Sequence, residues 1–155
     1  MPKFGHKAFF GITEMGKTWT MKRLEGSLAR YKQKRIIYAG NGDLDWSPGA
    51  QVCWNADDLE RLLQNPKNQG AHVFLDEARV LFKHVKPRKH PLIDNLFTMG
   101  RHKGFTGYVA TQFPTSIPPA VRVNCNELYC FRLGSADHAK IVYEDFGDLH
   151  YQGKP

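Results

Sequence analysis

Short apolar runs alternate along the chain with stretches of mixed apolar and polar residues. Runs of apolar or β-branched residues that stop at a glycine or a polar residue predict strands over residues 6–10, 35–39, 71–75, 106–111 and 127–133. Helical spacing, capping residues and prolines predict helices over residues 16–32, 56–64, 92–102, 117–123 and 135–144. Strands that alternate with helices in this order predict an α/β fold with a mostly parallel central sheet.

Two of the predicted helices carry a stripe of large apolar residues. In the helix over 16–32 the stripe consists of Trp19, Leu24 and Leu28. In the helix over 56–64, Leu59, Leu62 and Leu63 are expected to face the protein interior. The segments 43–52 and 83–91 contain prolines and polar residues, so both are predicted to be loops.

Length and composition limit the class of protein. A chain of 155 residues with 41% hydrophobic and 24% charged residues suits one globular domain over 1–155 and excludes a disordered chain. The three cysteines are an odd number without a CxxC pair, which disfavours a disulfide framework and a four-cysteine zinc site. The sequence has no run of 18 apolar residues and no signal-peptide pattern, so we expect a soluble, cytoplasmic protein without a transmembrane segment.

The charge of the chain is uneven. Its formal net charge is +7, and the segments 17–35 and 79–103 each hold seven Lys or Arg residues against one acidic residue. After Leu133 the sign reverses, with four acidic residues against two lysines. Clustered positive charge favours a nucleic-acid partner, although a solvated basic face gives the same pattern.

A phosphate-binding loop is predicted between the first strand and the first helix. The matching residues of the motif GxxxxGK[ST] are Gly11, Ile12, Thr13, Glu14, Met15, Gly16, Lys17 and Thr18. The glycines let backbone N–H groups surround phosphates, Lys17 neutralises the terminal phosphates of ATP, and Thr18 can ligate Mg²⁺. The acidic residue Glu14 is unusual in such a loop, because it repels a triphosphate unless it turns away.

Two acidic residues follow the apolar run 71–75. Asp76 at the end of a buried strand can hold Mg²⁺ through its water shell, and Glu77 can polarise a water molecule for attack on the γ-phosphate. Together with the phosphate loop, this pair predicts ATP hydrolysis by water rather than phosphoryl transfer to a small molecule. The intervening strand 35–39 means that another strand can separate the phosphate-loop strand from its sequence neighbour in the sheet.

Further motifs give the chain a family resemblance over residues 7–133. An Arg-x-x-Gly at 101–104 leads into a strand ending Ala-Thr-Gln at 110–112, and Pro114, Ile117, Asn124 and an aromatic–Arg pair at 131–132 follow. With the phosphate loop and the acidic pair, this order resembles the FtsK–HerA family of DNA-pumping ATPases. The small size is most similar to the genome-packaging ATPases of tailless viruses with internal membranes.

The resemblance implies a RecA-like (ASCE) P-loop NTPase core that uses ATP and Mg²⁺ to translocate DNA. It implies a homo-oligomeric ring, usually a hexamer, which packages a viral genome at a capsid or membrane portal vertex, in the host cytoplasm or associated with the virion. It also implies that Gln112 senses the γ-phosphate or orients the attacking water. Arg101 is the first choice for an arginine finger, and the alternatives are Arg79, Arg122 and Arg132.

A candidate DNA-binding loop follows the acidic pair. Its cations are Lys83, Lys86, Arg88 and Lys89. Such a loop can bind backbone phosphates independently of sequence, whereas a solvated surface loop has the same composition. Two other functions stay open: a filamentous-phage-type assembly or export ATPase, and a DNA-binding protein with a degenerate nucleotide site, which Glu14 favours.

Overall fold

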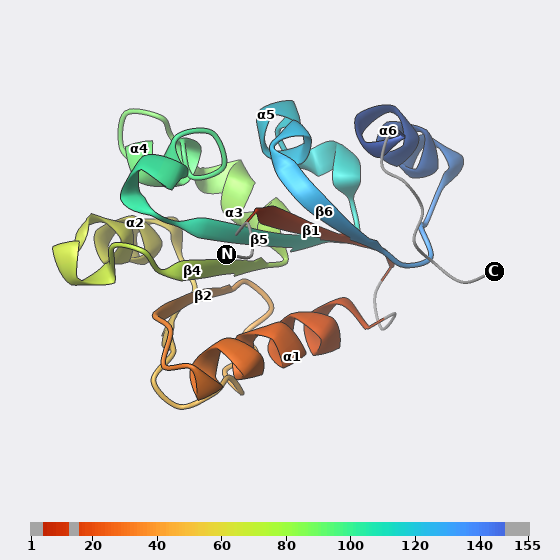
Figure 1. Cartoon of the computed structure of the whole chain (residues 1–155). Coiled ribbons are helices and arrows are strands. Elements are labelled where there is room, and N and C mark those ends of the chain that lie inside the picture. Colours follow the sequence, from red (N-terminus) through yellow and green to blue (C-terminus); the bar gives the residue numbers. More distant parts are fainter. Residues whose placement is uncertain (1–4, 13–15, 148–155) are drawn as a thin grey trace.

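The computed structural model describes residues 5–12 and 16–147, and its centre is one parallel sheet (Figure 1). In the described residues the sheet has six strands: β1 (His6–Phe10), β2 (Arg35–Ala39), β3 (Gln51–Cys53), β4 (His72–Asp76), β5 (Thr106–Thr111) and β6 (Cys125–Cys130). Their order is β3-β2-β4-β5-β1-β6, and every neighbouring pair is parallel. The predicted α/β fold with a parallel sheet is therefore confirmed.

Helices connect the strands on both faces of the sheet. The α-helices are α1 (Lys17–Arg30), α2 (Ala56–Gln64), α3 (Ala78–His84), α4 (Pro91–Asp94), α5 (Pro119–Val123) and α6 (Ala136–Phe146). Short 3₁₀ helices are η1 (Pro66–Asn68), η2 (Gly100–Lys103) and η3 (Pro114–Ser116). Figure 1 shows α1 on one face of the sheet and α3 to α6 on the other. No helix in the described ranges is long and apolar enough to cross a membrane.

The alternation of side chains along the strands gives each face its own core. Phe9, Ile37 and Phe74 are fully buried on the α1 side, where Met21 of α1 packs on them. Their strand neighbours, such as Leu75, point to the opposite face and pack with α2, α3 and α4. A strand with both faces covered must be apolar throughout, which explains why the central strands read as continuous apolar runs.

Strand order places two predicted motifs at one edge of the sheet. β5 lies between β1 and β4, with Phe10 opposite Thr111 and Leu75 opposite Val109. Because the strands are parallel, their carboxyl ends share one edge, where the phosphate loop follows β1 and the acidic pair ends β4. The first two strands of the chain are separated in the sheet by β4 and β5, in agreement with the expectation from sequence.

The predicted helix over 92–102 is wrong in its extent. The chain forms the short α4, then turns, and then η2. The Asn95 carbonyl accepts hydrogen bonds from the N–H groups of Thr98, Met99 and Gly100, which closes a turn instead of continuing the helix. Leu96 and Phe97 are both buried, and this turn brings the two consecutive side chains into the core.

Three smaller differences concern individual segments. The predicted loop 43–52 contains the start of β3, a three-residue edge strand that pairs with β2 and is too short to show alternation. The last strand begins and ends earlier than 127–133. Trp19 is 63% exposed and does not share the buried face with Met21, so the predicted apolar stripe of the first helix is wrong at that residue. Leu59 and Leu63 are buried as expected.

Candidate functional site

A cleft of about 420 Å³ opens at the carboxyl edge of the sheet. It is lined by residues from the start of α1, the end of β4 and the loop after β2: Gly16, Lys17, Thr18, Trp19, Asn41, Asp76 and Glu77. The structure thus brings the described part of the phosphate loop and the acidic pair to one cavity. Thr13, Glu14 and Met15, which were also predicted to bind nucleotide, lie outside the described residues.

Glycine is required at both described ends of the phosphate loop. Gly16 precedes α1 with φ 97°, a left-handed conformation that side chains rarely adopt. At Gly11 the reason is contact, because a Cβ atom there would lie 2.6 Å from the Cβ of Phe131. The N–H of Phe131 donates to the Phe10 carbonyl, and the N–H of Ile12 donates to the Arg132 carbonyl, so the chain after β6 fixes the entry to the loop.

Lys17 is held at the base of the loop. Its side chain is 7% exposed, and Nζ donates to the carbonyl oxygens of Gly11 at 2.5 Å and Ile12 at 3.0 Å. Burial lowers the pKa of Lys17, while the charges of Glu77 and Asp76 act in the opposite direction. Lys17 is the first residue of α1, so its charge adds to the positive end of the helix dipole and the free N–H groups of the first turn.

Asp76 is buried beneath the cleft and is hydrogen-bonded from two sides. Thr18 Oγ1 donates to Asp76 Oδ2 at 3.2 Å, and Asn41 Nδ2 donates to the same oxygen at 3.2 Å. Burial raises the pKa of Asp76, and the Thr18 hydrogen bond opposes that change. The oxygens of Thr18 and Asp76 are the hard donors that suit Mg²⁺.

These two donors fit a magnesium ion that is completed by phosphate and water oxygens. No cluster of three or more His, Cys, Asp or Glu side chains that could hold a metal is found among residues 5–12 and 16–147. Mg²⁺ is usually bound by one or two protein oxygens together with substrate phosphates and water, so a site with only these two protein donors suits it.

Glu77 has an unusual backbone. Its φ and ψ are 52° and 54°, the left-handed region, although it is not a glycine, and it is the N-cap residue of α3 without a capping side-chain bond. Such strain costs about 1–3 kcal/mol and concentrates at functional sites. Successive side chains of an extended strand point to opposite faces, whereas Asp76 and Glu77 both line this cleft, and the backbone leaves the extended conformation at Glu77.

The surroundings of the Glu77 carboxylate change its pKa. Burial raises the pKa of Glu77, whereas Lys17 and a hydrogen bond from the Gln112 backbone act to lower it. This bond joins the end of β5 to the end of β4 and places two residues with predicted catalytic roles next to each other. A half-buried carboxylate with a raised pKa is suited to accept a proton.

The arginines predicted as fingers differ in their surroundings. The backbone of Arg101 lies in η2, and its side chain falls outside the described part of the structure. Arg122 is buried, donates to the Ile117 carbonyl at 2.5 Å and pairs with Asp145 at 2.5 Å. It is therefore a structural residue that joins α5 to α6, and its candidacy as a finger is wrong.

The remaining two alternatives are accessible. The Arg79 guanidinium lies 4.2 Å from the ring centroid of Phe113, which follows Gln112 in the chain. Arg132 is exposed beside the entry to the phosphate loop.

The predicted DNA-binding cations lie at the end of α3 and in the loop after it. Lys83 belongs to the last turn of α3 and not to the loop, which corrects the boundary expected from sequence. Lys86, Arg88 and Lys89 are exposed in the loop, and Lys89 Nζ lies 3.3 Å from Asp57 Oδ1. All four cations remain accessible to a polyanion.

Sequence reasoning missed two residues of the cleft. Asn41 lies in the Gly-Asn-Gly turn after β2, and the position of that turn at a strand's carboxyl end was a usable signal. Trp19 was predicted only as part of an apolar stripe with Leu24 and Leu28, but it lines the cleft, and the Arg23 guanidinium lies 4.9 Å from its ring centroid.

Residues 47–140, more than half of the chain, match the family model described as Zonular occludens toxin (Zot). The chain belongs to the Zot family. The match begins before β3 and runs into α6, so it includes the acidic pair and Gln112 but not the phosphate loop. A comparison with curated proteins finds no match.

Solved structures with this fold include a Zot protein, a genome-packaging NTPase and a conjugation coupling protein. The N-terminal domain of zonular occludens toxin from Neisseria meningitidis is 17% identical with a TM-score of 0.58, and the alignment covers 90% of each chain. The genome-packaging NTPase B204 from Sulfolobus turreted icosahedral virus 2, in complex with AMPPCP, is 19% identical with a TM-score of 0.73, and covers 92% of this Zot-family chain and 82% of its own.

A further neighbour is the pCW3 conjugation coupling protein TcpA with ATPγS, at 15% identity and a TM-score of 0.70, covering 92% of this chain and 54% of TcpA. At 19% and 15% identity, B204 and TcpA show that the chain shares their fold, and they show no more than the fold. The RecA-like P-loop NTPase fold is confirmed by the same neighbours.

Proposed function

We propose that this Zot-family chain is an ATP-hydrolysing motor that translocates DNA. The observation that carries the proposal is the cleft in which Lys17 and Thr18 face Asp76 and Glu77. A phosphate-binding helix start, a buried oxygen pair for Mg²⁺ and a separately directed carboxylate are what ATP hydrolysis requires. That B204 and TcpA have been solved with nucleotide analogues supports the same assignment.

We assign a separate role in ATP hydrolysis to each residue of the nucleotide cleft. Lys17 and the N–H groups of α1 neutralise the β- and γ-phosphates, and Thr18 with Asp76 holds Mg²⁺, which when bound neutralises phosphate charge. Glu77 accepts the proton of the attacking water, and Gln112 orients that water or contacts the γ-phosphate. An arginine from a neighbouring subunit, Arg101 by first choice, completes the site in a ring of six copies.

DNA is the proposed substrate because of the basic segment after the acidic pair. α3 has Glu77 at its N-cap and Lys83 in its last turn, so the hydrolysis site and the basic segment share a helix of seven residues. At 1.5 Å per residue this helix is about 10 Å long. A change at Glu77 on hydrolysis therefore moves cations that can hold backbone phosphates.

Two settings for this motor differ in what is moved. In the first, it packages a viral genome into a capsid at a portal vertex, which the fold shared with a genome-packaging NTPase supports. In the second, it is an assembly or export ATPase of the filamentous-phage type. The family model that matches the chain is Zot and not a packaging family, so the match leaves this second setting open.

The test is ATP turnover by the purified chain with and without DNA, with Lys17→Ala as the inactive control. We expect Mg²⁺-dependent phosphate release that DNA stimulates, and no release from the control. Absence of turnover under both conditions contradicts the motor and favours a DNA-binding protein with a degenerate nucleotide site. Turnover that DNA leaves unchanged contradicts DNA as the substrate.

The role of the basic segment is tested by replacing its four cations with alanine: Lys83, Lys86, Arg88 and Lys89. DNA affinity should fall for all sequences, and the log–log salt slope should flatten by up to about four units, roughly one per lost phosphate contact. DNA-free ATP turnover should persist, because none of the four residues lines the nucleotide cleft. An unchanged salt slope shows that this segment does not contact DNA.

A further inference from the structure

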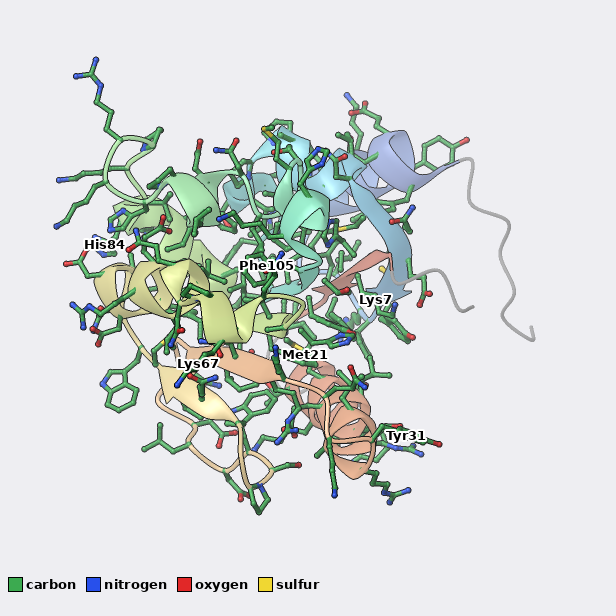
Figure 2. All side chains as sticks on the ribbon, turned by 60° about the vertical axis from the view of Figure 1, so that its left-hand side comes forward. Lys7, Met21, Tyr31, Lys67, His84 and Phe105 are labelled. Atoms are coloured by element: carbon green, nitrogen blue, oxygen red, sulfur yellow. The ribbon has the colours of Figure 1, made fainter. Side chains whose placement is uncertain are left out.

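A second cleft, of about 450 Å³, lies beside the basic segment. Its walls come from the end of β3, the start of α2, α3 and the loop after α3, and it is separate from the nucleotide cleft. The residues that matter here are Trp54, Val80, His84, Lys86, Lys89 and His90. Figure 2 shows His84 at the edge of the molecule, far from Tyr31 at the end of α1.

One wall of the second cleft is apolar and open to solvent. Trp54 is 60% exposed and Val80 is 42% exposed, although both lie next to a well-formed core. An exposed indole beside a cavity is a ready surface for a flat ring to stack on. Lys86 and Lys89 supply positive charge at the same cavity, and among the described residues that line it Asp57 is the one acidic residue.

The rim is held in place by a buried histidine. His90 is 3% exposed, its Nδ1 accepts a hydrogen bond from the Lys86 N–H at 3.0 Å, and its Nε2 lies 2.7 Å from Asp57 Oδ1. Because Nδ1 accepts, Nε2 carries the proton and donates it to Asp57. The backbone N–H groups of Lys89 and His90 both donate to the Lys86 carbonyl, which closes the loop on itself.

The contacts of Asp57 with His90 and Lys89 neutralise much of the acidic charge of the cavity. Asp57 accepts from His90 and pairs with Lys89, so the charges of Asp57 and Lys89 largely offset each other and Lys86 supplies the excess positive charge of the cavity. An aromatic stacking surface next to cations is the combination by which proteins hold single-stranded nucleic acid, with bases on aromatic rings and phosphates on Lys or Arg.

We propose that the second cleft holds an unpaired base of a DNA strand, stacked on Trp54, with the neighbouring phosphates at Lys86 and Lys89. The inference rests on the proposed function, because it takes DNA as the substrate, and it adds that the bound strand is unpaired. In duplex DNA the bases are stacked inside the helix and cannot reach the indole. Val80 and His84 belong to α3, so the bound base contacts the helix whose N-cap residue is Glu77.

The experiment compares two labelled oligonucleotides of equal phosphate count, oligo(dT) and a fully abasic strand, by fluorescence anisotropy at fixed salt. Wild type should bind oligo(dT) about tenfold more tightly, the usual size of one base–aromatic stack. Trp54→Ala should remove this preference and leave the affinity for the abasic strand unchanged. Tyr31→Ala is the matched control, since Tyr31 is 76% exposed and distant, and it should keep the preference.

The outcomes separate this inference from the proposed function. If wild type binds neither strand but binds a duplex of the same length, the inference is contradicted and the proposed function stands, whereas binding to none of the three contradicts both. If wild type binds both strands equally, or if Trp54→Ala keeps the preference, the second cleft does not hold a base, while DNA binding by the motor stands. If Trp54→Ala changes the oligomeric state and not the preference, a second copy of the chain covers Trp54, and the inference is wrong. Should Trp54→Ala fail to fold, Trp54→Leu keeps the apolar contact without the aromatic face and carries the same expectation.

Discussion

Mild acid is expected to destabilise the protein through His72, the first residue of β4. The His72 side chain is 4% exposed, and its Nδ1 lies 2.8 Å from the Tyr108 hydroxyl on the neighbouring strand. Burial, together with the smaller effect of the Lys7 charge, lowers the pKa of His72 from 6.5 to about 4. The folded protein therefore holds this imidazole neutral, while the unfolded chain protonates it more readily.

The size of the effect follows from the two pKa values. Because the pKa is depressed on folding, the stabilisation is fully present above pH 6.5 and is lost as the pH falls toward 4. At pH 5 the unfolded chain gains about 2 kcal/mol from protonating this residue, and at pH 7 only about 0.2 kcal/mol. The free energy of unfolding should therefore fall by about 2 kcal/mol between pH 7 and pH 5 through this group alone.

Urea unfolding at pH 7 and pH 5 measures the effect, with His72→Gln as the comparison. The variant has no titrating group at this position, so its loss of stability between the two pH values should be about 2 kcal/mol smaller than that of wild type. For each protein we take the difference between the free energies of unfolding at pH 7 and pH 5. A cost of the substitution that is the same at both pH values therefore cancels. Equal losses in the two proteins refute the reasoning that His72 is buried neutral.

Three further predictions concern other parts of the fold and site. Glu25→Ala should lower the free energy of unfolding by about 3–5 kcal/mol in urea titrations, because it leaves the buried Arg35 guanidinium without its ion pair at 2.9 Å. Gly40→Ala should cost about 1–3 kcal/mol by overpacking, since its Cβ would lie 3.0 Å from the Asp76 carbonyl oxygen, and should lower ATP turnover with it. If Arg101 acts in a neighbouring subunit, mixing Arg101→Ala with Lys17→Ala protein should restore some turnover, and no restoration in assembled mixtures counts against it.

The strands and the nucleotide cleft could be predicted from the sequence because their signals are local. A strand buried on both faces must be apolar throughout, and a phosphate loop needs its glycines in a fixed order. The strand ends then placed the loop and the Asp76–Glu77 pair at one edge of the sheet. The strand 35–39 before the acidic pair predicted that another strand can separate the phosphate-loop strand from its sequence neighbour. Which strands do so, in the order β2-β4-β5-β1, is seen only in the folded chain.

Features that depend on distant contacts could not be predicted. The left-handed conformation of Glu77 has no sequence signal, since most residues with positive φ are glycine or asparagine. Helical spacing placed Trp19 on one stripe with Leu24 and Leu28, but the buried face of α1 is set by the sheet, which Met21 contacts. The Arg122–Asp145 pair joins residues 23 positions apart, so only the folded chain shows that Arg122 is structural.

Glu77→Gln tests the central claim most directly, namely that this cleft hydrolyses ATP with Glu77 as the base. The change keeps the size of the side chain and removes its ability to accept a proton. Nucleotide binding and phosphate release should be measured on the same preparation, using a fluorescent ATP analogue and a phosphate assay. The account predicts that binding persists in Glu77→Gln while phosphate release stops. Phosphate release at the wild-type rate contradicts it.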